Sequence, residues 1–412
     1  MRWTDGPGGG HTTAAAAARR KAWGAAGRKA RGAVRKKAGN AVRNAAGTAS
    51  REAAWNAGRA ATRTGIRRGA AVAAGAAAVA AGEAARRRMR RPADITGRTA
   101  LVTGGSRGLG LLIARELGRC GARVLIVGRD EDALDAAVAD LRGEGIDASG
   151  LACDLALESD TAALSARVYS EYGGVDILVN NAGVIRVGPA AAMSEDDFAQ
   201  AAATMFWGPF RLTRALLPEL RERGGHVVTV TSIGGRVSVP HLLPYSCAKF
   251  AEVAFSRGLD AETAGSGVHV TTVVPGLMRT GSHVGAEFAG APGSEYAWFA
   301  TAASLHLLSM DAERAARTIV RGALSGRRHL VLTPAARAAV IADGLSPGLV
   351  QAAMRVTARL LPHDESGTAR TGGRARDRTG ALLDTLTRLN DRAARRFNQI
   401  PGERGHGAVG EE

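Results

Sequence analysis

The chain has 412 residues, 45% of them hydrophobic, and a formal net charge of +17 at pH 7. The charge is uneven, because residues 1–92 hold 21 of the 55 Lys and Arg residues but only 3 of the 38 Asp and Glu residues. The remainder is close to neutral, which excludes a general polyanion-binding role for the body of the protein on grounds of charge.

Residues 1–92 form a basic tail rich in Ala, Gly, Arg and Lys. This tail has too few large apolar side chains to bury a core, so we expect it to be disordered or partly helical. Its uncharged stretch at 69–82 is shorter than the ~20 apolar residues of a membrane span. Weak contact with a membrane surface or with nucleic acid through the tail is the alternative to a merely solvated segment.

Cysteine usage and the N-terminus predict the compartment. The 3 cysteines show no C-x-x-C pairing and no clustering with histidine, so neither a disulfide framework nor a metal site is expected. No secretory signal is visible in the first residues. We therefore expect a cytoplasmic protein, or one that is peripheral to the membrane through its tail.

From Thr99 onward, short β-branched runs alternate with helical patterns, which is typical of β-α-β units with a parallel sheet. We predict strands at 99–103, 123–127, 148–153, 176–180, 226–231, 268–274 and 329–333. We predict helices at 108–120, 130–142, 158–172, 196–222, 245–264 and 311–324. The expected fold is α/β, a doubly wound seven-stranded parallel sheet (Rossmann fold) with helices on both faces, in a domain of residues 93–335.

Residues 336–412 are expected to form a C-terminal helical extension with a polar tail. Helical segments are predicted at 335–361 and 379–397. We expect the first to pack on the body. The second has four leucines at helical spacing (Leu382, Leu383, Leu386 and Leu389), so it either docks on the body or mediates assembly.

A Gly-rich segment at 103–110 follows the first strand and opens the first helix. Glycines at this point let the backbone turn tightly and approach a pyrophosphate, which binds at the helix N-terminus. The spacing is G-x-x-x-G-x-G. The predicted cofactor-binding residues of this loop are Gly104, Ser106, Arg107, Gly108, Leu109 and Gly110.

The end of the second strand indicates which dinucleotide is bound. A site for NAD places an acidic residue near this point, where it holds the ribose 2′-hydroxyl. This chain has Gly128-Arg129 there, and Arg107 in the preceding loop. Two guanidinium groups suit a 2′-phosphate, so NADP (NADPH) is the predicted cofactor. The alternative for Arg129 alone is a solvated loop arginine.

Tyr245 and Lys249 are four residues apart and share one face of a helix that begins near Pro244. An ammonium group beside a phenol stabilises the phenolate, so the pair could exchange a proton with a carbonyl oxygen as it becomes an alcohol. The spacing alone is a weak signal, because surface helices carry such pairs by chance. Its meaning depends on the rest of the chain.

Five motifs occur in the order, and on the elements, that characterise the short-chain dehydrogenase/reductase (SDR) family. They are the Gly-rich loop, Asn180-Asn181-Ala182-Gly183, Ser232, the pair Tyr245 and Lys249, and Pro275-Gly276. The chain resembles this family from about residue 97 to residue 334. Segments 275–280 and 296–299 are similar to a bacterial subgroup of oxidoreductases, and that similarity extends through the C-terminal helices.

The resemblance implies roles for these residues. Ser232 would hold the substrate oxygen, Tyr245 would be the catalytic acid or base, and Lys249 would bind the nicotinamide ribose and favour the Tyr phenolate. Thr280 would reach the nicotinamide carboxamide. The other implied cofactor contacts are Asp154 at the adenine ring, Asn181, Ala182 and Gly183 beside the cofactor, and Pro275 and Gly276 along the nicotinamide. The resemblance also implies a homo-oligomer formed through the long helices at 196–222 and 245–264.

One position departs from the family pattern. The family has an Asn three residues before a Gly on the long helix, where it helps to hold a water that links Lys to bulk solvent. This chain has Met205 before Gly208, and a thioether cannot donate a hydrogen bond. Thr204 is a poor substitute, because its side chain points about 100° away on an α-helix with about 3.6 residues per turn.

The segment 277–310 follows the predicted nicotinamide contact and contains Phe288, Tyr296, Trp298 and Phe299. An apolar lid at the carboxyl ends of the strands favours a lipophilic or bulky carbonyl, and a structural helix pair is the alternative. The leading interpretation is an NADP-dependent carbonyl reductase that interconverts a carbonyl and a secondary alcohol of a small molecule. The alternatives are a cofactor-binding protein of low activity tethered by its tail, and a sugar-nucleotide epimerase or dehydratase.

Overall fold

The computed structural model describes residues 92–304, 309–364, 367–376 and 381–399. The predictions for the basic tail therefore lie outside the described residues, apart from Pro92. Among the helices that are described, none is both long and apolar enough to cross a membrane.

Seven parallel strands form the central sheet in the order β11-β7-β6-β4-β1-β2-β3. The strand order runs outward from β1 and β4, so the topological switch point lies between these two strands. This confirms the predicted fold class, and every predicted strand is found. The bounds are β1 (Thr99–Thr103), β2 (Arg123–Gly128), β3 (Ala148–Ala152), β4 (Ile177–Asn180), β6 (His226–Val230), β7 (His269–Val274) and β11 (His329–Val331).

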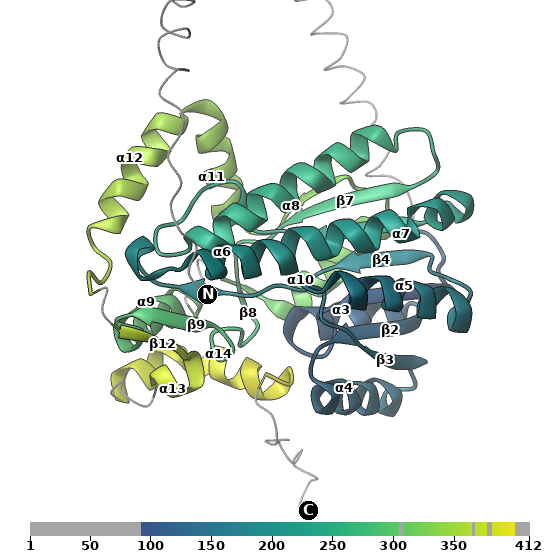
Figure 1. The fold of residues 1–412 in the computed structure, drawn as a ribbon, viewed down its shortest axis with the longest axis horizontal. Coiled ribbons are helices and arrows are strands. Elements are labelled where there is room, and N and C mark those ends of the chain that lie inside the picture. The colour runs from purple at the N-terminus through teal and green to yellow at the C-terminus, as the bar shows by residue number, and fades with distance from the viewer. Residues whose placement is uncertain (1–91, 305–308, 365–366, 377–380, 400–412) are drawn as a thin grey trace, which may run out of the picture. The chain divides into compact units, whose positions relative to one another are not determined.

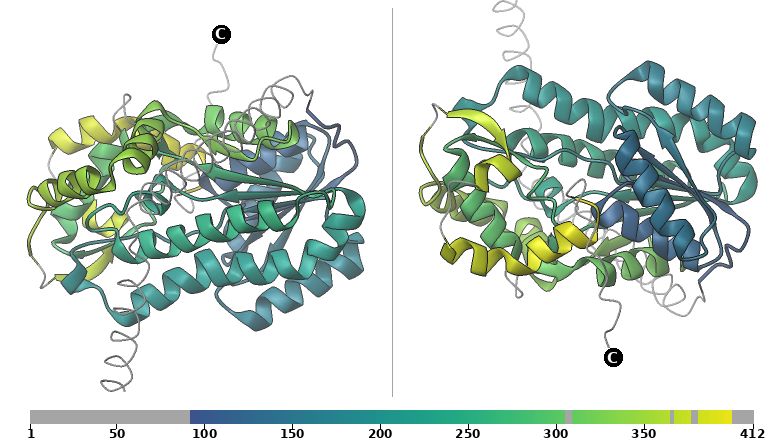
Figure 2. Two further views of the ribbon diagram at one scale, coloured as in Figure 1. Left: turned by 90° about the horizontal axis from the view of Figure 1, so that it is seen from above. Right: turned by 90° about the horizontal axis from the view of Figure 1, so that it is seen from below.

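Helices cover both faces of this sheet (Figures 1 and 2). One hydrophobic cluster joins the sheet to α3 (Gly108–Arg119), α4 (Glu131–Gly143) and α10 (Ala312–Leu324). A second cluster on the opposite face joins it to α5 (Glu158–Tyr172) and α7 (Gly208–Arg223), and α8 (Leu243–Glu262) packs beside β7. The sheet is therefore buried on both sides, which is why its strands are apolar almost throughout.

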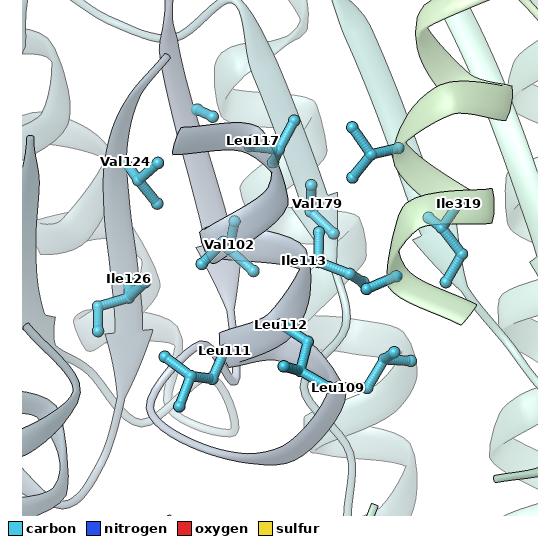
Figure 3. Close-up of a cluster of buried hydrophobic side chains, with 14 of the residues drawn as sticks. Val102, Leu109, Leu111, Leu112, Ile113, Leu117, Val124, Ile126, Val179 and Ile319 are labelled. Atoms are coloured by element: carbon cyan, nitrogen blue, oxygen red, sulfur yellow. The ribbon is translucent and has the colours of Figure 1, made fainter. Parts of the chain in front are cut away.

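The first of these clusters fixes the Gly-rich loop relative to the sheet (Figure 3). Val102 of β1 lies in register between Ile126 of β2 and Val179 of β4, and all three are buried. Ile113 and Leu117 of α3 pack over them at a four-residue interval. Burial of each such side chain contributes about 1.5–3 kcal/mol, so the loop between β1 and α3 is held at both ends by core packing.

The long helix predicted at 196–222 is interrupted. It consists of α6 (Glu195–Ala202), a π-helical turn at Ala203–Trp207 and then α7. The capping box at Ser194 and Asp197 starts α6 at its predicted position. The π-turn was not predicted, because one inserted residue leaves no clear mark in the apolar pattern.

Two small sheets and one helix on the carboxyl side of the central sheet were also not predicted. One sheet has the order β12-β9-β5 and the other pairs β10 with β8. These strands are two to five residues long, too short for an alternating pattern to identify them. Their bounds, with the adjoining elements, are β5 (Arg186–Val187), η1 (Ala190–Ala192), η3 (Ile233–Gly235), β8 (Leu277–Arg279), β9 (Glu287–Gly290), α9 (Pro292–Ser304), β10 (Ser309–Asp311) and β12 (Gly367–Thr371).

The C-terminal helices differ from one another in how they pack. The segment predicted as one helix at 335–361 is two helices, α11 (Pro334–Leu345) and α12 (Pro347–Ala358), divided at Pro347. Of their residues only Ala336 is buried, so the prediction that this segment packs on the body is wrong for nearly all of its length. After α13 (Gly372–Arg376), the helix α14 (Ala381–Arg396) docks on the body through its C-terminal half.

Candidate active site

A cavity of about 810 Å³ opens at the carboxyl ends of the central strands. The segments that follow β1, β2, β3, β4, β6 and β7 all contribute to its wall, as expected for a doubly wound sheet. Every residue that the sequence nominated lines this cavity. The cofactor candidates are Gly104, Ser106, Arg107, Gly108, Leu109, Gly110, Arg129, Asp154, Asn181, Ala182, Gly183, Pro275, Gly276 and Thr280, and the catalytic candidates are Ser232, Tyr245 and Lys249.

Close backbone approach explains the Gly-rich loop. A Cβ atom on Gly110 would overlap the carbonyl oxygen of Gly104, so only glycine fits where α3 passes the end of β1. Asn181 Nδ2 donates hydrogen bonds to the carbonyl oxygens of Thr103 and Gly104, at 3.0 and 3.3 Å. The amide of Asn181 therefore ties the loop to β4.

The two arginines at the adenosine end have acidic partners. Arg107 donates to Asp130 at 2.8 Å, and Arg129 lies 3.8 Å from Asp154. Asp130 also caps α4 by accepting from the backbone N–H of Ala133. The hydrogen bond from Ala133, followed by the one from Arg107, lowers the pKa of Asp130. Asp130 thus stays ionised and holds the Arg107 side chain at the mouth of the cavity.

The catalytic candidates converge from two elements. Ser232 follows β6 and its Oγ accepts a hydrogen bond from Gly234 N–H at 3.0 Å, while Tyr245 and Lys249 lie on α8. A Cβ on Gly234 would lie 3.1 Å from the Tyr245 ring and 3.5 Å from Ser232 Oγ, so the hydroxyl and the ring flank the same point. Lys249 Nζ is 5.9 Å from the centre of the Tyr245 ring.

Lys249 has a partner that the sequence analysis missed. Its Nζ donates to Glu252 Oε2 at 2.7 Å and to the carbonyl oxygen of Val230 at 3.0 Å. Both side chains are almost completely buried, and Glu252 Oε1 has no hydrogen-bond partner in the described structure. Burial raises the pKa of Glu252 to about 7. Burial opposes the charge on Lys249, but Glu252 and Tyr245 outweigh it and raise the pKa of the ammonium group.

Thr204 and Met205 of the π-turn have different surroundings. Met205 is fully buried in a small cluster with Ala201 and Ala248 and is not part of the cavity wall, whereas Thr204 lines the cavity. Thr204 follows Gln200 and Ala201 of the cavity wall by four and three residues, which is the spacing of one α-helical face. The side chains of Thr204 and Met205 therefore point in different directions, and Thr204 does not take the place of the family's Asn.

The aromatic residues of the predicted lid do not line the cavity. Phe288, Tyr296 and Phe299 are buried in a separate hydrophobic cluster with Val187 and Leu242, so their role is structural. The part of the wall outside the nominated residues is mixed. It includes the apolar side chains Val184, Ile185, Met278 and Ala286 and the polar side chains Arg186, Asp197, Gln200, Thr204 and Glu287.

The shape and the donors of the cavity fit a dinucleotide. The first turn of α3 offers the N–H groups of Leu109 and Gly110, which have no intrahelical partner. The glycines admit a pyrophosphate against this turn, and Arg107 and Arg129 lie at the mouth where a 2′-phosphate would bind. Within the described ranges, no group of three or more His, Cys, Asp or Glu side chains is placed to hold a metal ion.

Two residues of the site were not predicted from the sequence, and only the first had a signal there. Glu252 shares a helix face with Lys249 and Ser256, at intervals of three and four residues, which would have placed a carboxylate beside the lysine. Gln399 lines the cavity from beyond α14. Nothing local in the sequence connects it with a loop nearly three hundred residues earlier.

Comparison with known proteins shows which family the chain is similar to. The sequence model of the short chain dehydrogenase family matches residues 98–287. A Streptomyces coelicolor protein described as a ketoacyl reductase is 40% identical over 184 residues, which are 44% of this chain and 70% of that protein.

Solved structures share the fold. A short-chain dehydrogenase from Streptomyces avermitilis superposes with a TM-score of 0.56 at 31% identity, covering 64% of this chain and 98% of its own. L-Sorbose reductase from Gluconobacter frateurii, complexed with NADPH and L-sorbose, gives a TM-score of 0.52 at 25% identity, covering 58% and 96%. With its parallel sheet, its Gly-rich loop and its relatives, the chain belongs to the short-chain dehydrogenase family.

Proposed function

We propose that the protein is an NADP-dependent oxidoreductase that interconverts a carbonyl and a secondary alcohol, with Tyr245 as the acid or base. The observation that carries the proposal is the single cavity shared by Ser232, Tyr245, Lys249 and the Gly-rich loop. The likeness to a reductase complexed with NADPH, together with Arg107 and Arg129, supports NADP over NAD.

The residues of the chain would have the following roles in the reaction. When bound, the nicotinamide supplies or accepts a hydride. Tyr245 donates its phenolic proton to the carbonyl oxygen during reduction, and Ser232 Oγ fixes that oxygen by a hydrogen bond. The Lys249 ammonium stabilises the phenolate that remains. In alcohol oxidation the same proton returns to Tyr245.

We infer that Glu252 positions Lys249 in this chain. The family's Asn position is occupied by Met205, which is buried behind the cavity wall in a cluster against which Tyr245 packs. Glu252 and the carbonyl oxygen of Val230 instead fix two of the three donors of the ammonium group. Thr204, on the cavity wall, is the hydroxyl that could hold a water near the third donor.

The substrate class follows from the mixed cavity wall. The aromatic side chains that suggested a lipophilic substrate belong to the core, and the remaining wall contains both apolar and charged side chains. Ile185 and Met278 suit an apolar portion of the substrate, and Arg186 and Gln200 suit polar groups. We therefore propose a bulky carbonyl compound that combines apolar and polar parts.

The test is to titrate the purified full-length protein with NADPH and NADH and then to screen ketones and aldehydes for turnover. We expect tighter binding of NADPH, turnover of at least one carbonyl, and a loss of about 10³-fold or more in turnover in Tyr245→Phe with NADPH binding retained. Absence of NADPH binding and of turnover in the native protein would refute the proposal. Binding without turnover of any carbonyl would favour the alternative, a cofactor-binding protein of low activity whose basic residues 1–92 tether it to a membrane surface or to nucleic acid.

A homo-oligomer is also proposed, from an aromatic patch on the outer side of the π-turn, α7 and α8. Phe206, Trp207 and Phe210 contact one another, and Phe210 meets Phe255 of α8 with ring centres 5.7 Å apart. Trp207 is 46% exposed, and Phe250 of α8 is 43% exposed. Exposed aromatic clusters of this kind are typical of protein interfaces.

A further inference from the structure

The last described residues of the chain lie on the Gly-rich loop. The N–H of Gly108 donates to the carbonyl oxygen of Phe397 at 2.8 Å. Asn398 Nδ2 donates to the carbonyl oxygen of Ser106 at 2.9 Å and to that of Ala133 at 3.1 Å. The C-terminal end of α14 therefore contacts the loop, the first turn of α3 and α4 at once, and it ends beside them in the right-hand view of Figure 2.

Local sequence causes this docking. Asn398 has a φ angle of 56°, and Gln399 N–H donates to the carbonyl oxygen of Ala394 at 2.9 Å, which together close α14 with a left-handed C-terminal cap. Asparagine tolerates this conformation better than most residues. Phe397 is 3% exposed and belongs to the core cluster that also contains α3. The cap turns the chain, and Phe397 anchors it against the loop.

The same helix also contacts the segment that follows β8, on the other side of the cavity. Asn390 Oδ1 accepts the N–H of Gly281 at 2.9 Å, and Asp391 Oδ1 lies 3.1 Å from His283 Nε2. A Cβ on Gly281 would overlap the backbone of Ala394, so the two segments are in close contact. Residue 281 directly follows Thr280, the predicted nicotinamide contact. α14 thus bridges the two loops between which the dinucleotide would lie.

This arrangement places Gln399 in the wall of the cavity. It is 9% exposed, it lines the cavity, and its side-chain amide has no hydrogen-bond partner among the described residues. Its Nε2 would lie 2.6 Å from a Cβ on Gly108, directly over the first turn of α3. Phe397 occupies the Gly108 N–H but leaves the Leu109 and Gly110 N–H groups free. A neutral amide donor beside two free N–H groups is suited to an anion.

We propose that Asn390, Asp391 and residues 397–399 form a C-terminal clamp on the cofactor. Gln399 donates a hydrogen bond to the diphosphate, and the clamp must move for the dinucleotide to leave. This inference rests on the proposed NADP site. Because the clamp touches both cofactor loops, it slows cofactor release, and it gives this chain a diphosphate ligand that lies outside the Gly-rich loop.

The test uses full-length protein carrying Gln399→Ala or Gln399→Glu, with Arg392→Gln, an exposed change on the same helix, as the matched control. NADPH affinity is measured by fluorescence titration, and its release rate by stopped flow. Loss of a hydrogen bond to a charged group predicts about 10-fold weaker binding for Gln399→Ala. The added negative charge in Gln399→Glu predicts a loss of about 100-fold, and Arg392→Gln should bind NADPH as the native protein does.

Adenosine 2′-monophosphate, which lacks the diphosphate, serves as the second probe. Its affinity should be the same in the native protein and in both Gln399 variants. If NADPH and the monophosphate weaken equally, Gln399 acts through the loop structure and the direct contact is refuted. Unchanged or tighter NADPH binding in both variants refutes the clamp, and tighter binding identifies the segment as a plug. Failure of the native protein to bind NADPH at all would instead refute the NADP site on which the clamp rests.

Discussion

At the scale of single residues, the acidity of Tyr245 depends on how far neighbouring groups offset the positive charge of Lys249. The ammonium group is held between Tyr245, which it assists, and Glu252, which neutralises it at 2.7 Å. Because burial brings the pKa of Glu252 to about 7, its carboxyl group changes charge within the neutral range. Below this pH the lysine acts on the phenol with its full charge, and above it the carboxylate offsets part of that charge.

Replacement of Glu252 by Gln should therefore shift the pH dependence of the reaction. In Glu252→Gln the positive charge beside Tyr245 is not offset at any pH, so the acid limb of the rate of alcohol oxidation should move down by about one pH unit. The measurement is kcat against pH for oxidation with NADP.

Glu262→Gln provides the matched control for this change, because Glu262 is an exposed residue at the end of the same helix. Its acid limb should coincide with that of the native protein. If Glu252→Gln also coincided with the native protein, Glu252 would be only a packing residue. Rescue of the native profile by Glu252→Asp would support the positioning role.

At the scale of elements, the π-turn at Ala203–Trp207 contributes to two surfaces. Thr204 lies on the cavity wall, and Phe206 and Trp207 belong to the aromatic patch on the outer side of α7 and α8. The same turn therefore shapes the inner and outer surfaces of this helix.

We expect the aromatic patch to form the interface between subunits. Trp207→Lys introduces a charge into a surface that would be desolvated, and it should convert the oligomer to monomers with the fold intact. Size-exclusion chromatography with light scattering measures the mass.

The control for the interface is Tyr169→Lys, which changes a 69% exposed aromatic residue on α5, away from the patch. Its mass should equal that of the native oligomer. A native protein that is monomeric, or a Trp207→Lys variant of unchanged mass, would place the interface elsewhere or remove it.

The elements also show which parts of the fold and of the site could be predicted from the sequence. The seven strands and the helices beside them could be predicted because each has an apolar period or a capping signal within its own residues. The motif residues converge on one cavity because parallel strands bring their carboxyl ends to one edge. Strands β5, β9 and β12 could not be predicted, because their pairing joins segments far apart in the chain. The spacing of Glu252 from Lys249 could have placed it beside the lysine, but its burial could not be predicted, because burial depends on tertiary packing.

At the scale of the whole molecule, two buried groups give the stability opposite pH dependences. Burial, followed by the charges of His269 and Arg98, lowers the pKa of His226 from 6.5 to about 4. The unfolded chain then binds the extra proton, so stability falls as the pH falls from 6.5 to about 4. The raised pKa of Glu252 has the opposite sign, and its stabilising contribution, present below pH 4.5, is lost as the pH rises to about 7.

The two opposite pH dependences of the free energy of unfolding should nearly cancel in the native protein and appear separately in variants. Each group changes the free energy of unfolding by about 3 kcal/mol between its unfolded and folded pKa values. His226→Asn should lose stability as the pH rises from 4.5 to 7, and Glu252→Gln should lose it as the pH falls from 6.5 to 4. Urea denaturation at several pH values gives the free energy of unfolding. Slopes unchanged from the native protein in both variants would show that neither group titrates in this way.

The contact between Asn398 and Ser106 joins residues 292 positions apart in the chain. During synthesis Asn398 leaves the ribosome 292 residues after Ser106 of the Gly-rich loop. A nascent chain can therefore build most of the sheet before the cofactor site is complete. Bound dinucleotide can stabilise the full site only after residue 399 has left the ribosome, so its availability should affect the lifetime of the folded protein more than the folding of the sheet during synthesis.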